Sequence, residues 1–188
     1  MLKIWRQKGF TLLELLIGIV ILLLVIGAVY EGYILSQKGY REGERAAEIT
    51  QNGRVILERM VREIRQAREV VTVLPEGEDG AMGEILFEDG HITEVYHYVY
   101  YFKEDNNFCR KVIGYYFSGD ASQTLVPWDA TPPPGESLVE KTLEPKVIVG
   151  EYVDSIKFWD SGGINISLTL KKQNKTLNLS TKVSSRNI

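Results

Sequence analysis

The chain has 188 residues and a formal net charge of -3 at pH 7, which suits one globular domain and an anchor but is short for two domains with separate cores. Residues 74–188 carry 11 basic against 17 acidic side chains. An acidic balance lacks the basic stripe that a nucleic-acid groove needs, so no nucleic-acid partner is expected. Cys109 is the single cysteine, which excludes an internal disulfide, and its place in an expected strand predicts a small buried residue rather than a reactive thiol.

The first 30 residues have the pattern of a membrane anchor. Residues 1–9 carry Lys3, Arg6 and Lys8 and no acid, and residues 10–30 carry one charge, Glu14. A run of that length matches the ~20 residues of a membrane-spanning helix. It exceeds the ~7–15 apolar residues of a secretory signal, and no A-x-A site follows. The basic leader predicts a cytoplasmic N-terminus, a single-pass transmembrane helix at 10–30 and an extracytoplasmic remainder.

Glu14 is unusual in such a run. An ionisable residue inside a bilayer is costly and marks a functional site by default. Because Glu14 is the fifth residue of the run, it could also reach water at the cytoplasmic interface. The anchor sequence alone leaves both interpretations open.

The helix is expected to continue beyond the membrane, as the exported half of one long helix at residues 31–73. This stretch has no proline before Pro75, and opposite charges at i,i+4 spacing predict a solvated face. Apolar or small residues recur at helical spacing and predict a stripe that another element must cover: Ile49, Gly53, Ile56, Met60, Ile64, Ala67 and Val71.

Residues 74–188 are predicted to form an antiparallel β-sheet domain. GEILF and HITEVYHYVYYF flank Asp89-Gly90, which suits a type I′ hairpin turn. Asn106-Asn107 predicts the next turn, and a loop is expected from 118 to 145 because its proline run cannot join a sheet interior. Alternation of apolar and polar residues then predicts a meander up to the C-terminal region. The expected fold class is α+β, with a long N-terminal helix packed against antiparallel sheet.

Chemistry is sparse in this domain. No Gly-rich phosphate loop, HExxH, GxSxG or EF-hand pattern occurs in the sequence. His91 and His97 stand in the tyrosine-rich strand region without a partner motif. We therefore expect no catalytic residues, no metal site and no cofactor, and a protein that is not an enzyme.

The segment Gly9-Phe10-Thr11-Leu12-Leu13-Glu14-Leu15-Leu16, after a short basic leader, resembles the class III signal of type IV pilins and pseudopilins. The resemblance implies that residues 1–9 are a leader peptide, removed by prepilin peptidase between Gly9 and Phe10, and that the new Phe10 amine is methylated. It also implies that Glu14 pairs with the N-terminal ammonium of a neighbouring subunit during filament assembly. The glutamate would then be unpaired in one subunit and paired in the assembly.

Beyond residue 30 the resemblance is looser. The helix, the sheet-rich domain and the ending TKVSSRN are similar to J-type minor pseudopilins of type II secretion and to W-like minor pilins. These imply a subunit in or at the tip of a pseudopilus or pilus, partnered by other pilin-like subunits and the membrane. The chain departs from major pilins in lacking a C-terminal cysteine pair. The alternative is an extracytoplasmic binding domain or enzyme that residues 10–30 anchor permanently.

Overall fold

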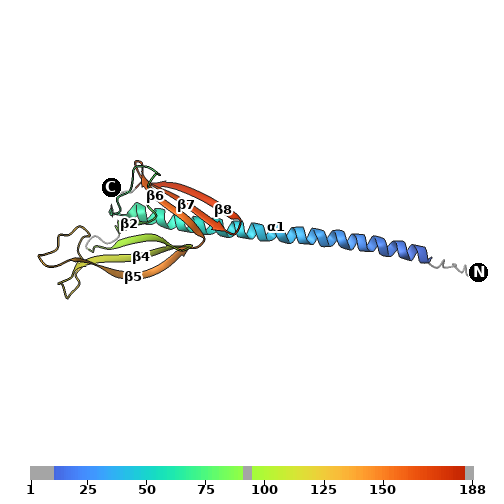
Figure 1. Cartoon of the computed structure of the whole chain (residues 1–188), viewed down its shortest axis with the longest axis horizontal. Helices are drawn as coiled ribbons and strands as arrows, with labels where there is room; N and C mark the ends of the chain where they lie inside the picture. Colours follow the sequence, from blue (N-terminus) through green and yellow to red (C-terminus); the bar gives the residue numbers. More distant parts are fainter. Residues whose placement is uncertain (1–10, 91–94, 185–188) are drawn as a thin grey trace, which may run out of the picture. The chain divides into compact units, whose positions relative to one another are not determined.

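A computed structural model describes residues 11–90 and 95–184 (Figure 1). The chain divides into two compact units at residues 44 and 45, and each is described by itself. One helix, α1 (Leu12–Gln66), supplies both units with helical residues. The structure has this helix and antiparallel sheets, which confirms the predicted α+β class.

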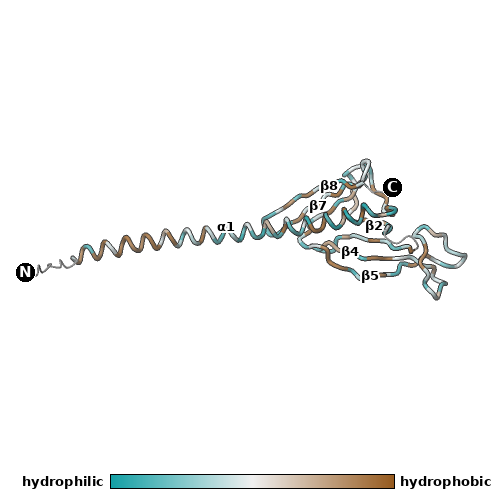
Figure 2. The backbone as a smooth tube through the Cα atoms, turned by 180° about the vertical axis from the view of Figure 1, so that it is seen from behind, coloured by the Kyte–Doolittle hydropathy of each residue, from teal (hydrophilic) through white to brown (hydrophobic). Residues whose placement is uncertain are grey.

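The first unit consists, in its described part, of α1 up to residue 44. An 18-residue window of this helix has a mean hydropathy of 3.0, and none of that window is buried. Figure 2 shows the apolar colouring near the start of α1. Among the described residues this is the one helix long and apolar enough to cross a membrane, judged by length and composition.

In the second unit, the C-terminal part of α1 lies between two antiparallel sheets (Figures 1 and 2). Sheet A has the strand order β1-β2-β3-β4-β5, and sheet B has the order β6-β7-β8. The strands of sheet A are β1 (Glu69–Val70), β2 (Ile85–Glu88), β3 (Tyr98–Glu104), β4 (Asn107–Phe117) and β5 (Leu138–Gly150). Those of sheet B are β6 (Val153–Asp160), β7 (Ile164–Lys172) and β8 (Lys175–Val183), which together form the predicted meander.

The predicted apolar stripe of α1 forms the centre of the core. Ile56, Met60 and Ile64 are fully buried, and burying each such side chain contributes about 1.5–3 kcal/mol. Gly53 allows the helix to approach sheet B closely, because a Cβ there would lie 2.5 Å from Leu179 Cδ1. Side chains from both sheets join the same cluster, so the part of α1 that belongs to the second unit is covered on both sides.

The helix ends earlier than predicted, at Gln66 instead of residue 73. The backbone N–H of Arg68 donates to the Glu88 carbonyl, and that of Val71 donates to the Leu86 carbonyl. Residues 70–73 read Val-Val-Thr-Val, and β-branched residues favour strand over helix. Pairing with β2 therefore ends the helix before Pro75 can.

The predicted type I′ hairpin at Asp89-Gly90 is wrong. Glu88 pairs with Tyr98, so residues 89–97 connect the strands, and the Asp89 N–H donates to the His97 carbonyl at 2.8 Å. Residues 91–94, and with them His91, lie outside the described part of the chain. Gly90 serves another purpose: a Cβ there would lie 2.0 Å from the Gln66 carbonyl oxygen. The glycine allows this connection to pass close to the end of α1.

Two further boundaries differ from the prediction. The β3–β4 turn is centred on Asp105 and Asn106, since Glu104 pairs with Asn107, and Asp105 takes a φ of 53°. The loop predicted for 118–145 ends where β5 begins, at Leu138, so Pro145 lies within a strand. β5 is an edge strand, and the register shifts beside Pro145. A proline without an N–H is tolerated at such an edge or bulge.

Candidate functional site

The start of α1 carries a reciprocal hydrogen-bonded pair between Thr11 and Glu14. The Thr11 backbone N–H donates to Glu14 Oε2 at 3.0 Å, and the Thr11 hydroxyl donates to the same oxygen at 3.1 Å. In return, Thr11 Oγ1 lies 3.3 Å from the Glu14 backbone nitrogen. Threonine before the first helical residue and glutamate three positions later form a capping box, which satisfies backbone N–H groups that the helix leaves free.

This arrangement fixes where the Glu14 carboxylate lies. Both contacts with Thr11 use Oε2, and Oε1 bonds to none of residues 11–90 and 95–184. The side chain is exposed, so its second oxygen can accept a hydrogen bond from a group outside the chain. Gly9 and Phe10, between which cleavage is predicted, lie outside the described residues.

The sequence carries a pattern that is typical of this geometry. Thr-x-x-Glu ahead of an apolar run is the signature of a capping box. The role expected for Glu14 rested on a neighbouring subunit alone. The structure adds an intramolecular role, in which Glu14 also caps its own helix.

The residues after Glu14 present an uninterrupted apolar surface. A Cβ added at Gly18 or Gly27 would meet nothing within 4 Å, so each glycine leaves open surface for a neighbouring helix. The large apolar side chains from 12 to 30 are between 48% and 81% exposed: Leu12, Leu13, Leu15, Leu16, Ile17, Ile19, Val20, Ile21, Leu22, Leu23, Leu24, Val25, Ile26, Val29 and Tyr30. Lipid or other helices must cover this surface.

A polar cluster in the second unit joins α1 to sheet A. Arg110 Nε lies 3.0 Å from Glu63 Oε2, and Arg110 Nη1 lies 2.7 Å from Glu144 Oε2. The Tyr101 hydroxyl donates to Glu63 at 2.9 Å. Burial lowers the pKa of Arg110, but its bonds to Glu144 and Glu63 outweigh this and raise the pKa above its ordinary value. The guanidinium therefore stays charged and acts as a bridge between helix and sheet.

A second polar cluster lies where the chain passes from sheet A to sheet B. Glu48 of α1 accepts hydrogen bonds from Lys172 and from the Tyr152 hydroxyl. Lys172 Nζ also lies 4.3 Å from the centroid of the Tyr152 ring. Tyr152 takes a φ of 65°, a strained backbone for a bulky residue. Its hydrogen bond to Glu48 and its ring contact with Lys172 hold that strained connection against the helix.

Cys109 has the environment of a packing residue. It is fully buried, as predicted, and burial raises the pKa of its thiol, which leaves little of the nucleophilic thiolate at neutral pH. Tyr98 and Tyr101 are also fully buried. Within the described ranges, no group of three or more His, Cys, Asp or Glu side chains is placed to hold a metal ion.

Comparison with known proteins addresses the N-terminal segment. The family described as "Prokaryotic N-terminal methylation motif" matches residues 6–30. No curated protein and no solved structure matches the chain. The matched stretch contains the Thr11–Glu14 capping box and the exposed apolar turns that follow it.

Proposed function

We propose that this chain, which carries the N-terminal methylation motif of the type IV pilin and pseudopilin superfamily, is a minor pilin-like subunit of an extracytoplasmic filament. Prepilin peptidase removes residues 1–9 by cleavage between Gly9 and Phe10, and the Phe10 amine is then methylated. The mature chain enters a type II secretion pseudopilus or a type IV pilus, within it or at its tip. The observation that carries the proposal is the methylation motif at the head of a helix whose apolar first half is exposed.

The charge balance at the helix start explains how assembly is driven. Cleavage removes Lys3, Arg6 and Lys8 and leaves an ammonium at Phe10. In the low dielectric of a bilayer, a lone carboxylate and a lone ammonium are both costly, and pairing them offsets part of that cost. Because Thr11 holds only Glu14 Oε2, the same carboxylate caps its own helix and offers Oε1 to the ammonium of a neighbour.

Helix packing supplies the rest of the driving force. Contact between these apolar side chains and water is unfavourable, so the helix stays in lipid until other helices cover it. Gly18 and Gly27 offer flat positions where a neighbouring helix can approach. A subunit out of register would leave the Glu14 and Phe10 charges unpaired, so charge pairing sets the register of packing.

The second unit has a structural role in this proposal. It meets partner subunits outside the cytoplasm, with the N-terminus on the cytoplasmic side before cleavage, and it performs no reaction and binds no nucleic acid. A charged cluster supports this role, since Arg110 bonds to both Glu63 and Glu144 and fastens helix to sheet. The partners are prepilin peptidase, other pilin-like subunits and the membrane.

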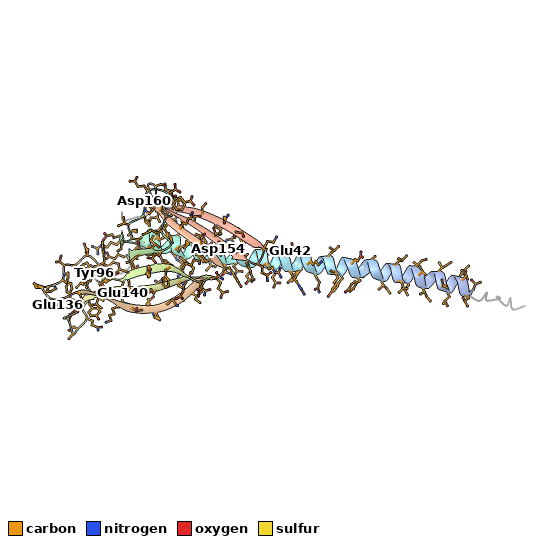
Figure 3. All side chains as sticks on the ribbon, in the orientation of Figure 1. Glu42, Tyr96, Glu136, Glu140, Asp154 and Asp160 are labelled. Carbon is orange, nitrogen blue, oxygen red and sulfur yellow. The ribbon has the colours of Figure 1, made fainter. Side chains whose placement is uncertain are left out.

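Reversing the charge of Glu14 in the native host tests the proposal. The Glu14→Lys variant should be cleaved and should reach the membrane, yet its amount in filaments sheared from the cells should fall at least about tenfold. Glu42→Lys makes the same charge change at an exposed acid of the same helix (Figure 3), and it should be incorporated normally. Undiminished incorporation of Glu14→Lys, or an uncleaved wild-type chain, would overturn the proposal in favour of a permanently anchored domain.

A further inference from the structure

Acidic and basic residues of the second unit are concentrated in different parts of its sequence. Residues 74–152, which supply β2 to β5 of sheet A, carry five Lys or Arg against 15 Asp or Glu, a net charge of -10. Residues 153–188, which supply sheet B, carry six against two, a net charge of +4. The overall acidity of the domain therefore conceals two regions of opposite sign.

The outer face of sheet B, which points away from α1, is defined by strand register. Ile156, Leu168 and Leu179 are opposite one another and belong to the core or pack against it, so the alternate residues form the other face. That face holds three lysines, small hydroxyl and amide side chains, one tryptophan and no acid: Ser155, Lys157, Trp159, Asn165, Ser167, Thr169, Lys171, Thr176, Asn178, Ser180 and Lys182. All of them are exposed or half-buried.

The acidic region is equally accessible. Ten carboxylates of residues 74–152 are exposed, against two exposed lysines, Lys103 and Lys146. Figure 3 places Glu136 and Glu140 at sheet A and Asp160 at the end of sheet B. The exposed carboxylates are Glu76, Glu78, Asp79, Glu84, Glu104, Asp105, Asp129, Glu140, Glu144 and Glu151.

Within one chain the two regions meet along β6, where Met82 and Phe158 exchange backbone hydrogen bonds and the Asp160 N–H donates to the Pro75 carbonyl. Glu78 and Lys157 form an exposed ion pair at 2.9 Å, beside the edge of β6. α1 lies between the two sheets (Figures 1 and 2), and the outer face of sheet B is the face opposite the core side chains, so it does not cover sheet A of its own chain. Two surfaces of opposite charge that point apart on one molecule suit a head-to-tail contact between molecules.

The free strand edges favour contact through this face. β8 carries Lys175 and Lys182, and β5 carries Lys141, Pro145 and Lys146. Lysine and proline on an edge strand oppose the addition of another strand. The small Ser, Thr and Asn side chains of the outer face leave it flat enough to lie against another folded surface.

We propose that the outer face of sheet B docks on the acidic sheet A region of a second copy of this chain, in a head-to-tail contact between neighbouring subunits. The inference extends the proposed assembly role by naming a partner for the second unit. It does not depend on Glu14 or on cleavage. The occupant is a second copy because the chain itself supplies the complementary charge.

Zero-length cross-linking of mixed isotopes tests the contact. Full-length chains with natural and with heavy nitrogen are mixed in lipid nanodiscs and treated with a carbodiimide, which joins a lysine amine to a touching carboxylate as an amide with loss of water. Mass spectrometry should find mixed-isotope links from Lys171 or Lys182 to acids of residues 74–152. Raising the salt from 50 mM to 500 mM should reduce them at least about fivefold, because screening weakens exposed charge pairs.

Charge reversal supplies the matched controls. The double variant Lys171→Glu with Lys182→Glu should abolish the contact. Lys157, the lysine of the outer face that this variant keeps, should then form no mixed-isotope links. Lys103→Glu with Lys141→Glu makes the same charge change in sheet A and should leave the links of the outer face in place. Links confined to one isotope, or equal loss in both double variants, would overturn the head-to-tail contact. Transfer of the links to another protein or to added DNA would overturn it as well. None of these outcomes alters cleavage at Gly9, which the N-terminal peptide reports separately.

Discussion

Glu63 of α1 and Arg110 of β4 form a partly buried ion pair, with 3.0 Å between Glu63 Oε2 and Arg110 Nε and side chains 17% and 13% exposed. Tyr101 donates its hydroxyl to the same carboxylate. The pair fastens the last turns of the helix to β4 of sheet A. Removal of one partner would leave the other charge poorly solvated, which costs more than the loss of an exposed pair.

Arg110→Met should therefore lower the free energy of unfolding by about 2 kcal/mol, less than for a fully buried pair because Glu63 keeps some contact with water. Lys157→Met breaks the exposed pair with Glu78 and should change it by less than about 1 kcal/mol. Denaturant unfolding followed by tryptophan fluorescence measures both. Equal effects of the two variants would contradict a special role for Arg110.

Gly90→Ala should destabilise the second unit by about 1–3 kcal/mol, because the new Cβ would overlap the Gln66 carbonyl and neither backbone can move far. Gly77→Ala is the matched control. A Cβ there meets nothing within 4 Å, and the residue does not have a positive φ. The control should be neutral or slightly stabilising. Thermal unfolding of both variants measures the difference in stability. A neutral Gly90→Ala would show that this close approach is absent.

Sequence predicts the fold best where a single rule acts. The helical spacing of Ile49, Ile56 and Met60 predicts the buried stripe, and strict alternation predicts sheet B. It fails where two rules compete. Residues 67–73 continue the helical spacing, yet the β-branched residues among them favour a strand, and the backbone of residues 68–72 bonds to β2. Asp89-Gly90 has the composition of a tight turn, but the glycine is needed for its approach to α1.

The candidate site was predictable in residue identity and less so in geometry. Glu14 is conspicuous because it is the one charge in residues 10–30. Its bonds to Thr11 depend on where the helix begins, which the Thr-x-x-Glu pattern indicates and the apolar run alone does not. The charged outer face of sheet B depends on register, and the net acidity of residues 74–188 conceals it.

Burial raises the pKa of Tyr98 to about 12, from an ordinary value of 10.0. The folded state thus holds this proton more tightly than the unfolded chain does. The resulting stabilisation is complete below pH 10 and is lost as the pH rises from about 10 to about 12. The unfolding free energy should fall across that window.

Tyr98→Phe identifies the contribution of this hydroxyl. The variant should be less stable near pH 7 by about 1 kcal/mol, because the backbone N–H of Trp128 loses the Tyr98 hydroxyl as its acceptor. Between pH 10 and 12, the unfolding free energy of the variant should fall less than that of the unmodified chain. Some fall remains, because burial also raises the pKa values of Tyr100, Tyr101 and Tyr115. An unchanged decline would rule out Tyr98 as a source.

Thr11→Val removes the hydroxyl that donates to Glu14 and keeps the shape of the side chain. Incorporation into filaments should fall several-fold, because the carboxylate loses one of its two contacts and its orientation. Thr11→Ser keeps the hydroxyl and should be incorporated almost normally. The amount of chain in sheared filaments, relative to the processed chain in the membrane, is the measurement. Similar incorporation of Val and Ser variants would show that Thr11 does not position Glu14.

The most direct test is the mass of the N-terminal peptide of the protein from its native membrane. A pilin-like subunit should begin at Phe10 and carry one added methyl group on its amine. A chain that still begins at Met1 or Leu2, in cells with an active prepilin peptidase, would contradict the account and leave residues 10–30 as a permanent anchor.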